Sequence, residues 1–189
     1  MSFSKEQIMN LLKNEPYKLG HFLGYKDLTE LHNVWLKDWL YSSKDSTTQA
    51  HRGSYKTSVD ALFIALNTII RPWERLLFLR KTDDDVTEVI VQVQTMMRSG
   101  AMQEIAQALH DAPLILNKDT NSEIDTSYHA GVSGASQVRG FGIGASLTGK
   151  HADIVITDDI VNIKDRISKA EREHTKLIYQ ELQKVKNRG

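Results

Sequence analysis

The sequence predicts an α/β domain in which a mainly parallel sheet is flanked by helices and preceded by a helical appendage. From residue 46 onward, apolar segments with the character of strands alternate with amphipathic helical segments, as in parallel sheets covered on both faces. Residues 1–45, in contrast, have only helical patterns. A chain of 189 residues with 40% hydrophobic content can form one domain with a substantial core. We therefore expect a helical lead-in over residues 1–45 and a core over residues 46–189, within one domain overall.

The lead-in contains three predicted helices. Residues 4–12 and 17–23 are short and amphipathic, and residues 27–30 have the pattern of a capping box that opens a third helix. The apolar residues of this third helix are Leu28, Leu31, Val34, Trp35 and Leu40. Because Trp35 and Trp39 fall within this pattern, we interpret them as core residues rather than as residues that stack on a ligand.

The predicted core opens with two units of strand and helix. A short strand over residues 47–50 leads through a polar turn into a helix whose apolar face comprises Val59, Leu62, Phe63, Leu66 and Ile70. A second strand over residues 75–79 precedes a helix start at residues 82–85, where three aspartates suit the positive end of the helix. The helix that follows has apolar residues at helical spacing, namely Val86, Val89, Ile90 and Val93.

The second half of the core begins with short strands or hairpins and ends with a strand and a helix. Residues 113–116 and 124–128 have strand character, and a glycine-dense stretch follows. Residues 152–157 predict a buried strand that ends in two aspartates. A capping box at residues 168–171 then opens the last helix.

Charge and composition exclude several classes of protein. The 24 basic residues balance the 24 acidic ones, so any contact with nucleic acid must be a local patch. The chain has no cysteine, which leaves neither disulfides nor thiolate zinc sites and fits a reducing intracellular setting. No apolar run approaches the roughly 20 residues that span a bilayer, and a signal-peptide pattern is absent, so we expect a soluble protein. The seven histidines have no spacing typical of a zinc site.

Lys56 and Thr57 lie between the first predicted strand and its helix, where such a pair can bind a nucleotide phosphate. The lysine would contact the outer phosphates, the threonine hydroxyl would help to hold magnesium, and backbone N–H groups would supply further donors. Residues 50–57 read AHRGSYKT, and therefore depart from the pattern G-x-x-x-x-G-K-S/T at both glycines, which Ala50 and Tyr55 replace. Taken alone, the segment is also an ordinary helix start.

The acidic pair Asp158 and Asp159 follows the predicted strand over residues 152–157, at the end of a strand where open α/β sheets bind ligands. Asp158 would coordinate magnesium, and Asp159 would orient and polarise the water that attacks the terminal phosphate. A solvated acidic turn is the alternative. The interval between Lys56 and Asp158 leaves room for a strand between the two motif strands, which predicts a P-loop NTPase of the additional-strand (ASCE) type.

With these motifs, the chain resembles the ATPase domain of the large terminase subunit of tailed bacteriophages. The resemblance covers most of the chain and rests on residues 49–57, residues 78–82 and above all residues 146–153, which lead into the acidic pair. It implies hydrolysis of ATP with Mg²⁺ to drive double-stranded DNA into the procapsid. Implied partners are a portal protein, a small terminase subunit and further copies in a homo-oligomeric ring, in the host cell cytoplasm and without a membrane. The family's coupling strand and nuclease domain do not appear in the sequence, so we expect a C-terminally truncated fragment.

The resemblance also implies roles for individual residues. Arg52 stands where terminase loops have an arginine that acts on the phosphates from within the same subunit, although a surface arginine is the alternative. The implied nucleotide-binding residues are Gln49, His51, Arg52, Gly53, Ser54, Tyr55, Lys56 and Thr57, although a purely structural role is the alternative for Gln49. The implied catalytic residues are Asp159, Arg52 and Lys56, and the implied magnesium ligands are Thr57 and Asp158.

Two further basic sites follow from the family. Thr148 stands where relatives have an arginine that reaches the neighbouring subunit's nucleotide, so Lys150 and Arg139 are the nearby candidates for this trans-acting role. A solvated loop charge is the alternative for each of them. Arg80 and Lys81 follow a strand at which related translocases approach DNA, although a surface charge pair is the alternative. Two other functions remain open: a helicase-like translocase with the same nucleotide core, and a nucleotide-dependent adaptor with little hydrolysis.

Overall fold

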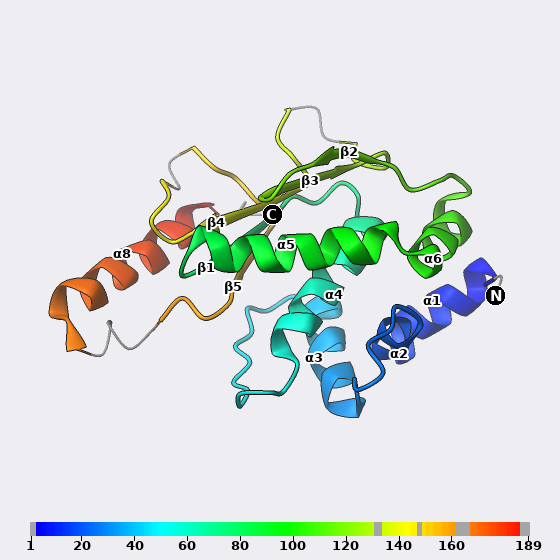
Figure 1. Cartoon of the computed structure of the whole chain (residues 1–189), viewed down its shortest axis with the longest axis horizontal. Helices are drawn as coiled ribbons and strands as arrows, with labels where there is room; N and C mark the ends of the chain where they lie inside the picture. The colour runs from blue at the N-terminus through cyan, green and yellow to red at the C-terminus, as the bar shows by residue number, and fades with distance from the viewer. Residues whose placement is uncertain (1–2, 131–133, 147–148, 162–166, 186–189) are drawn as a thin grey trace. The chain divides into compact units, whose positions relative to one another are not determined.

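The computed structural model describes residues 3–130, 134–146, 149–161 and 167–185 (Figure 1). The chain forms two compact units, of which the first comprises Met1–Ile70 and Gln92–Ile115 and the second comprises Arg71–Val91 and Leu116–Gly189. Within the described ranges, the first unit is helical and the second contains all the strands. The predicted boundary between residues 45 and 46 does not coincide with this division and stays a prediction.

The first unit contains the helices α1 to α4 before residue 71, and the second half of α5 and all of α6 after residue 91. Their bounds are α1 Lys5–Asn14, α2 Tyr17–Phe22, α3 Glu30–Tyr41, α4 Lys56–Ile70, the second half of α5 (Asp83–Arg98) and α6 Gly100–His110. The helix predicted after the Lys56–Thr57 pair is confirmed, because its apolar residues from Val59 to Ile69 are buried. The capping box predicted at residues 27–30 is wrong. The N-cap of α3 is Thr29, whose backbone N–H donates to Nδ1 of His32 at 2.8 Å.

The apolar side chains of α3 are not all in the core. Leu36 and Leu40 are buried, but Leu31 is 51% exposed and Val34 is 65% exposed. Trp35 and Trp39 are half-buried and stack on each other with ring centroids 6.3 Å apart. Trp39 also meets the ring of Phe63 on α4, edge to face, at 5.9 Å. Trp39 therefore packs against α4, and neither tryptophan is fully enclosed.

The second unit contains a five-stranded open sheet. The strands are β1 Leu76–Arg80, β2 Leu116–Asp119, β3 Glu123–Thr126, β4 Val138–Gly142 and β5 Ile154–Thr157, in the order β2-β3-β4-β1-β5. Strand β1 pairs in parallel with β4 and β5, whereas the β2–β3 and β3–β4 pairs are antiparallel. The sheet is therefore mixed, and the expectation of a mainly parallel sheet is corrected. Residues 120–122 alone join β2 to β3, which is too short for the crossover that a parallel pair needs.

Helices flank this sheet, and the first half of α5 approaches β4 closely (Figure 1). A Cβ added at Gly140 would lie 2.3 Å from Cγ1 of Val86, and one added at Gly142 would lie 2.7 Å from the backbone nitrogen of Asp83. The two strand glycines thus let the helix backbone come near the strand backbone. Helix α8 (Lys169–Val185) packs through Ile178 on a core cluster with Leu77 and Leu79, so α5 and α8 contribute to the covering of the second unit.

Two predicted strands differ in the structure. Residues 47–50 form no strand, because a strand needs a ladder partner and the described part of the first unit consists of helices. Thr48 instead accepts a hydrogen bond from the indole nitrogen of Trp39 at 3.2 Å. The strand predicted as buried over residues 152–157 forms as β5, but its four residues are half-buried, because β5 lies at the edge of the sheet with β1 as its one strand neighbour. Among the described residues, no helix has the length and apolar character needed to cross a bilayer.

Candidate nucleotide site

The loop before α4 bends sharply at its tip. The N–H of Ser54 donates to the carbonyl of His51 at 3.2 Å, which closes a turn at the tip of the loop. Gly53 has a φ of 85°, and Tyr55 has a φ of 56°, in the left-handed region that glycine enters most readily. Tyr55 stands where the phosphate-loop pattern has its second glycine. The side chain at this position therefore departs from the pattern, although its backbone is in a region that glycine enters readily.

Two side chains from the segment before and within α3 fix this loop. The hydroxyl of Tyr55 donates to Oδ2 of Asp27 at 3.0 Å, and Nε2 of His32 lies 2.9 Å from the carbonyl oxygen of Ser54. Since Nδ1 of His32 accepts the N–H of Thr29, the ring proton is on Nε2, which donates to the carbonyl. The hydrogen bond to the Asp27 carboxylate raises the pKa of Tyr55, because it stabilises the protonated phenol.

The predicted nucleotide-binding residues fall on this loop and on the first turn of α4. Lys56 and Thr57 are the first two residues of the 15-residue helix, where N–H groups and the positive end of the helix dipole favour a bound anion. Both side chains are half-buried, whereas Arg52 and Gln49 are exposed. His51 and Gly53 are also exposed, and Ser54 is 8% exposed. The residues predicted to bind phosphate thus come from one short segment.

The predicted acidic pair lies in the second unit, after the carboxyl end of β5. The backbone N–H of Asp158 donates to the carbonyl of Leu79 at 2.9 Å, and the residue is 2% exposed. Nε of Arg80 lies 3.2 Å from Oδ2 of Asp158. A buried carboxylate is costly unless it is paired, and Arg80 supplies the opposite charge. The structure therefore gives the predicted magnesium ligand a protein counterion.

Asp159 has a different environment from its neighbour. It is exposed, and its φ of 50° places it in the left-handed region, which aspartate tolerates better than most residues that have a Cβ. The chain thus turns sharply after β5, so that one carboxyl is buried and the next is in solvent. An exposed carboxylate at this strand end is accessible to a water molecule.

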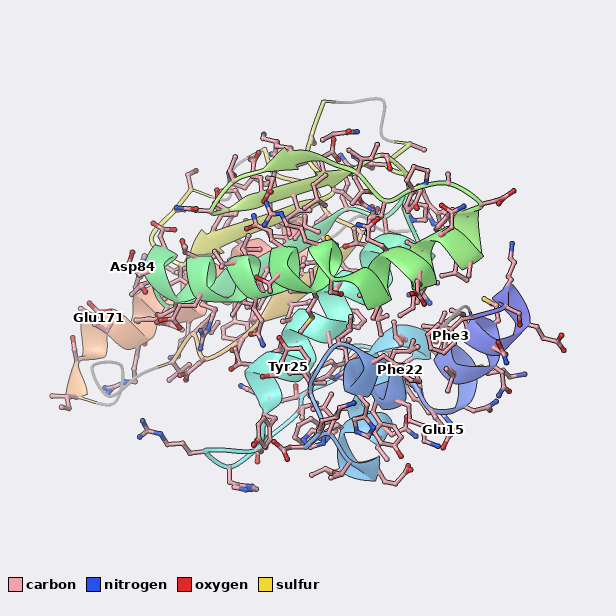
Figure 2. The ribbon with its side chains drawn as sticks, turned by 45° about the vertical axis from the view of Figure 1, so that its right-hand side comes forward. Phe3, Glu15, Phe22, Tyr25, Asp84 and Glu171 are labelled. Atoms are coloured by element: carbon pink, nitrogen blue, oxygen red, sulfur yellow. The ribbon has the colours of Figure 1, made fainter. Side chains whose placement is uncertain are left out.

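The pairing of Arg80 with Asp158 is a feature that sequence reasoning missed. Arg80 ends β1 and Asp158 directly follows β5, and the two strands are parallel neighbours with Leu79 opposite Thr157. The sequence did contain a signal for this pair. Opposite charges follow two apolar segments, and the carboxyl ends of adjacent parallel strands lie side by side. Lys81, the next residue, lies 3.6 Å from Glu171, which Figure 2 labels near the start of α8. Both basic residues considered for DNA contact thus form ion pairs within the second unit.

The two candidates for a trans-acting basic residue also lie in the second unit. Arg139 Nε is 3.3 Å from Oε1 of Glu123, and Lys150 Nζ lies 3.8 Å from the ring centroid of Phe141, in a cation–π contact. Both line a cavity of about 220 Å³, which is also bordered by Arg75 and His151. Thr148, where relatives have the arginine, lies outside the described residues.

The side chains predicted to bind magnesium are a hydroxyl in the first unit and a carboxylate in the second. Hydroxyl and carboxylate oxygens are the ligands that Mg²⁺ prefers, and it commonly needs only one or two protein ligands beside substrate phosphates. In the described ranges, no group of three or more histidine, aspartate or glutamate side chains could hold a metal ion by itself. Lys56 and Thr57 belong to the first unit, and Asp158 and Asp159 to the second. Comparison of the chain with models of protein families and with curated protein sequences gives no match.

Proposed function

We propose that this chain is the ATPase domain of a viral terminase large subunit, with a P-loop core of the additional-strand type. In this function, ATP hydrolysis with Mg²⁺ drives double-stranded DNA into the procapsid. The observation that carries the proposal is the left-handed backbone of Tyr55, at the place of the pattern's second glycine and directly before Lys56 and Thr57 at the start of α4. This combination supports a phosphate loop, although the strand expected before it at residues 47–50 does not form.

The residues around α4 would bind the phosphates. The N–H groups of the loop and helix start would donate to the phosphate oxygens, and the Lys56 ammonium would contact the outer phosphates. Arg52 is exposed near the tip of the loop, so its guanidinium can move to the terminal phosphate and stabilise charge there. Gln49, His51, Gly53 and Ser54 would complete the surroundings of the nucleotide.

The acidic pair would act on the metal and on water. Thr57 and Asp158 would hold the magnesium ion, which when bound supplies positive charge to the β- and γ-phosphate oxygens. Asp159 would accept a hydrogen bond from the attacking water and orient it. Its exposure supports this role, and its side chain is shorter than the glutamate usual at this position. Asp158 would have to share its carboxylate between the metal and Arg80.

The partners of the proposed motor follow from the resemblance to terminases. They are double-stranded DNA, a portal protein, a small terminase subunit and further copies of the chain in a ring, in the host cell cytoplasm. Lys150 and Arg139 would reach the nucleotide of a neighbouring copy. The cavity that they line gives them a common surface, and this supports their treatment as one basic group.

The second candidate is a nucleotide-dependent adaptor with little hydrolysis. The ion pair between Arg80 and Asp158 favours it, because a buried carboxylate already neutralised by a guanidinium binds a metal ion less readily. In this case ATP would bind through the loop of the first unit, and the acidic pair would contribute to the fold rather than to catalysis.

Single-turnover hydrolysis with excess magnesium tests the proposal. Lys56→Ala is expected to slow phosphate release by about 100-fold or more, as loss of a charge-stabilising group does in phosphoryl transfer. Lys37→Ala, which removes an exposed lysine of α3, is the matched control and should change nothing. If neither the wild type nor Lys56→Ala releases phosphate, but Lys56→Ala binds ATP more weakly than the wild type, the chain is the adaptor. An absence of ATP binding by the wild type would refute both functions.

A further inference from the structure

Residues 25–32 contact the phosphate loop directly at two places, and Gln92 links them to the start of α4, all within the first unit. Asp27 accepts the hydroxyl of Tyr55 at 3.0 Å, and His32 donates to the Ser54 carbonyl at 2.9 Å. The link to α4 runs through Gln92. The side-chain amide of Gln92 lies 2.9 Å from the hydroxyl oxygen of Tyr25, labelled in Figure 2, and 3.4 Å from the hydroxyl oxygen of Ser58.

His32 uses both of its ring nitrogens in this arrangement. Nδ1 accepts the N–H of Thr29 and thereby caps α3, while Nε2 donates to Ser54. The residue is 5% exposed, so water does not readily replace either hydrogen bond. The position of the loop carbonyl is therefore tied to the start of α3 by one rigid ring.

Tyr55 needs such support more than a glycine would. A residue with a Cβ enters the left-handed region at a cost in free energy, and it persists there only when surrounding contacts fix it. The charge-assisted hydrogen bond to Asp27 fixes the far end of the side chain, and the ring also meets that of His32 edge to face at 6.3 Å. The same contacts stop the ring, which is 46% exposed, from swinging across the loop.

We propose that Asp27 and His32 are positioning residues of the nucleotide site, which substitute for the missing glycine of the phosphate loop by holding Tyr55 and Ser54 in place. This inference rests on the proposed function, because it assumes that the loop binds the phosphates of ATP. It adds that the competent loop is created by the helical lead-in. Asp27 acts on nucleotide affinity through the hydroxyl of Tyr55.

A double-mutant cycle on Asp27 and Tyr55 tests this. The readout is the dissociation constant of a fluorescent ATP analogue with Mg²⁺, measured by equilibrium titration of the full chain. Asp27→Ala and Tyr55→Phe are each expected to weaken binding by about five- to tenfold, the loss of one charge-assisted hydrogen bond. The double variant should be no weaker than either single variant by more than about twofold, because both remove the same contact.

Matched controls separate this effect from a general loss of stability. Tyr41→Phe removes another tyrosine hydroxyl of the first unit, which donates to the carbonyl of Leu12 at 2.9 Å on a side chain that is 48% exposed. Asp38→Ala removes an exposed aspartate of α3. Both should bind the analogue like the wild type. Circular dichroism should give the same helix content for all variants at the temperature of the titration.

The outcomes distinguish this inference from the proposed function. If Lys56→Ala abolishes binding while Asp27→Ala and Tyr55→Phe leave it unchanged, the phosphate loop stands and the positioning role is overturned. Losses that multiply in the double variant would also overturn it, because Asp27 and Tyr55 would then act separately. If the wild type fails to bind the analogue, or Lys56→Ala binds equally well, the proposed function itself fails.

Discussion

Arg80 Nε lies 3.2 Å from Oδ2 of Asp158, where the carboxyl ends of β1 and β5 lie next to each other. The side chain of Asp158 is 2% exposed and that of Arg80 is 14% exposed, so the pair is largely shielded from water. Arg80 also donates from Nη1 to the carbonyl of Asp85 at 3.2 Å. The guanidinium thus links the end of β1, the turn after β5 and the first turn of α5.

Removal of Arg80 is expected to destabilise the protein. Arg80→Ala leaves the Asp158 carboxylate buried without its counterion, which costs about 3 kcal/mol of unfolding free energy. Urea denaturation followed by fluorescence measures this loss. The control is Lys176→Ala, which breaks a surface ion pair with Glu173 at 2.9 Å and should cost less than about 1 kcal/mol. Equal losses for the two variants would contradict the structural role of the buried pair.

Asp159→Asn is expected to reduce hydrolysis without disturbing the fold. Asparagine tolerates the left-handed backbone of residue 159 as aspartate does, so the change removes a carboxylate without adding strain. If Asp159 orients the attacking water, single-turnover phosphate release should fall by about 100-fold while ATP affinity stays the same. Asp84→Asn, at an exposed aspartate in the first turn of α5, is the control. An unchanged rate in Asp159→Asn would remove this residue from the proposed mechanism.

The phenol of Tyr55 is expected to titrate above the usual pH range of tyrosine. The Asp27 carboxylate accepts a hydrogen bond from the Tyr55 hydroxyl, and this raises the pKa of Tyr55. Because the pKa is raised in the folded state, the contribution of the hydrogen bond is fully present below the ordinary pKa of tyrosine, about 10, and is lost as pH rises through the higher value. The difference in ultraviolet absorbance between the wild type and Tyr55→Phe isolates this group. Asp27→Asn should lower its pKa, and an unchanged titration would contradict the contact.

Gly140→Ala is expected to destabilise the second unit. The new Cβ would lie 2.3 Å from Cγ1 of Val86, so α5 must shift away from β4, at a cost of about 1–3 kcal/mol. Thermal unfolding measures the loss. Gly144→Ala is the matched control, because a Cβ there meets nothing within 4 Å. Adding Val86→Ala to Gly140→Ala should restore part of the stability, and a further loss instead would contradict the close approach.

Much of the local structure could be predicted because it depends on short-range patterns. The helix over residues 56–70 follows from apolar residues at helical spacing, and the start of α8 follows from Ser168, whose Oγ accepts the N–H of Glu171 at 3.3 Å. The strand before Asp158 and Asp159 also formed, because its apolar residues are consecutive. Lys56 and Thr57 identified the candidate residues for phosphate binding. The backbone conformation of Tyr55 could not be predicted, because the contacts that fix it come from Asp27 and His32, more than 20 residues earlier in the chain.

The sequence by itself therefore determined where helices begin, which segments are apolar and which residues are candidates for phosphate and metal chemistry. Only the tertiary structure decided that the sheet is mixed, that residues 47–50 form no strand and that Arg80 neutralises Asp158. It also decided that Asp27 and His32 contact the loop before α4. The physical reason is that helix periodicity and caps are encoded within a few residues, whereas ladder partners and buried ion pairs join residues far apart in the chain. Their energies depend on the fold that brings those residues together.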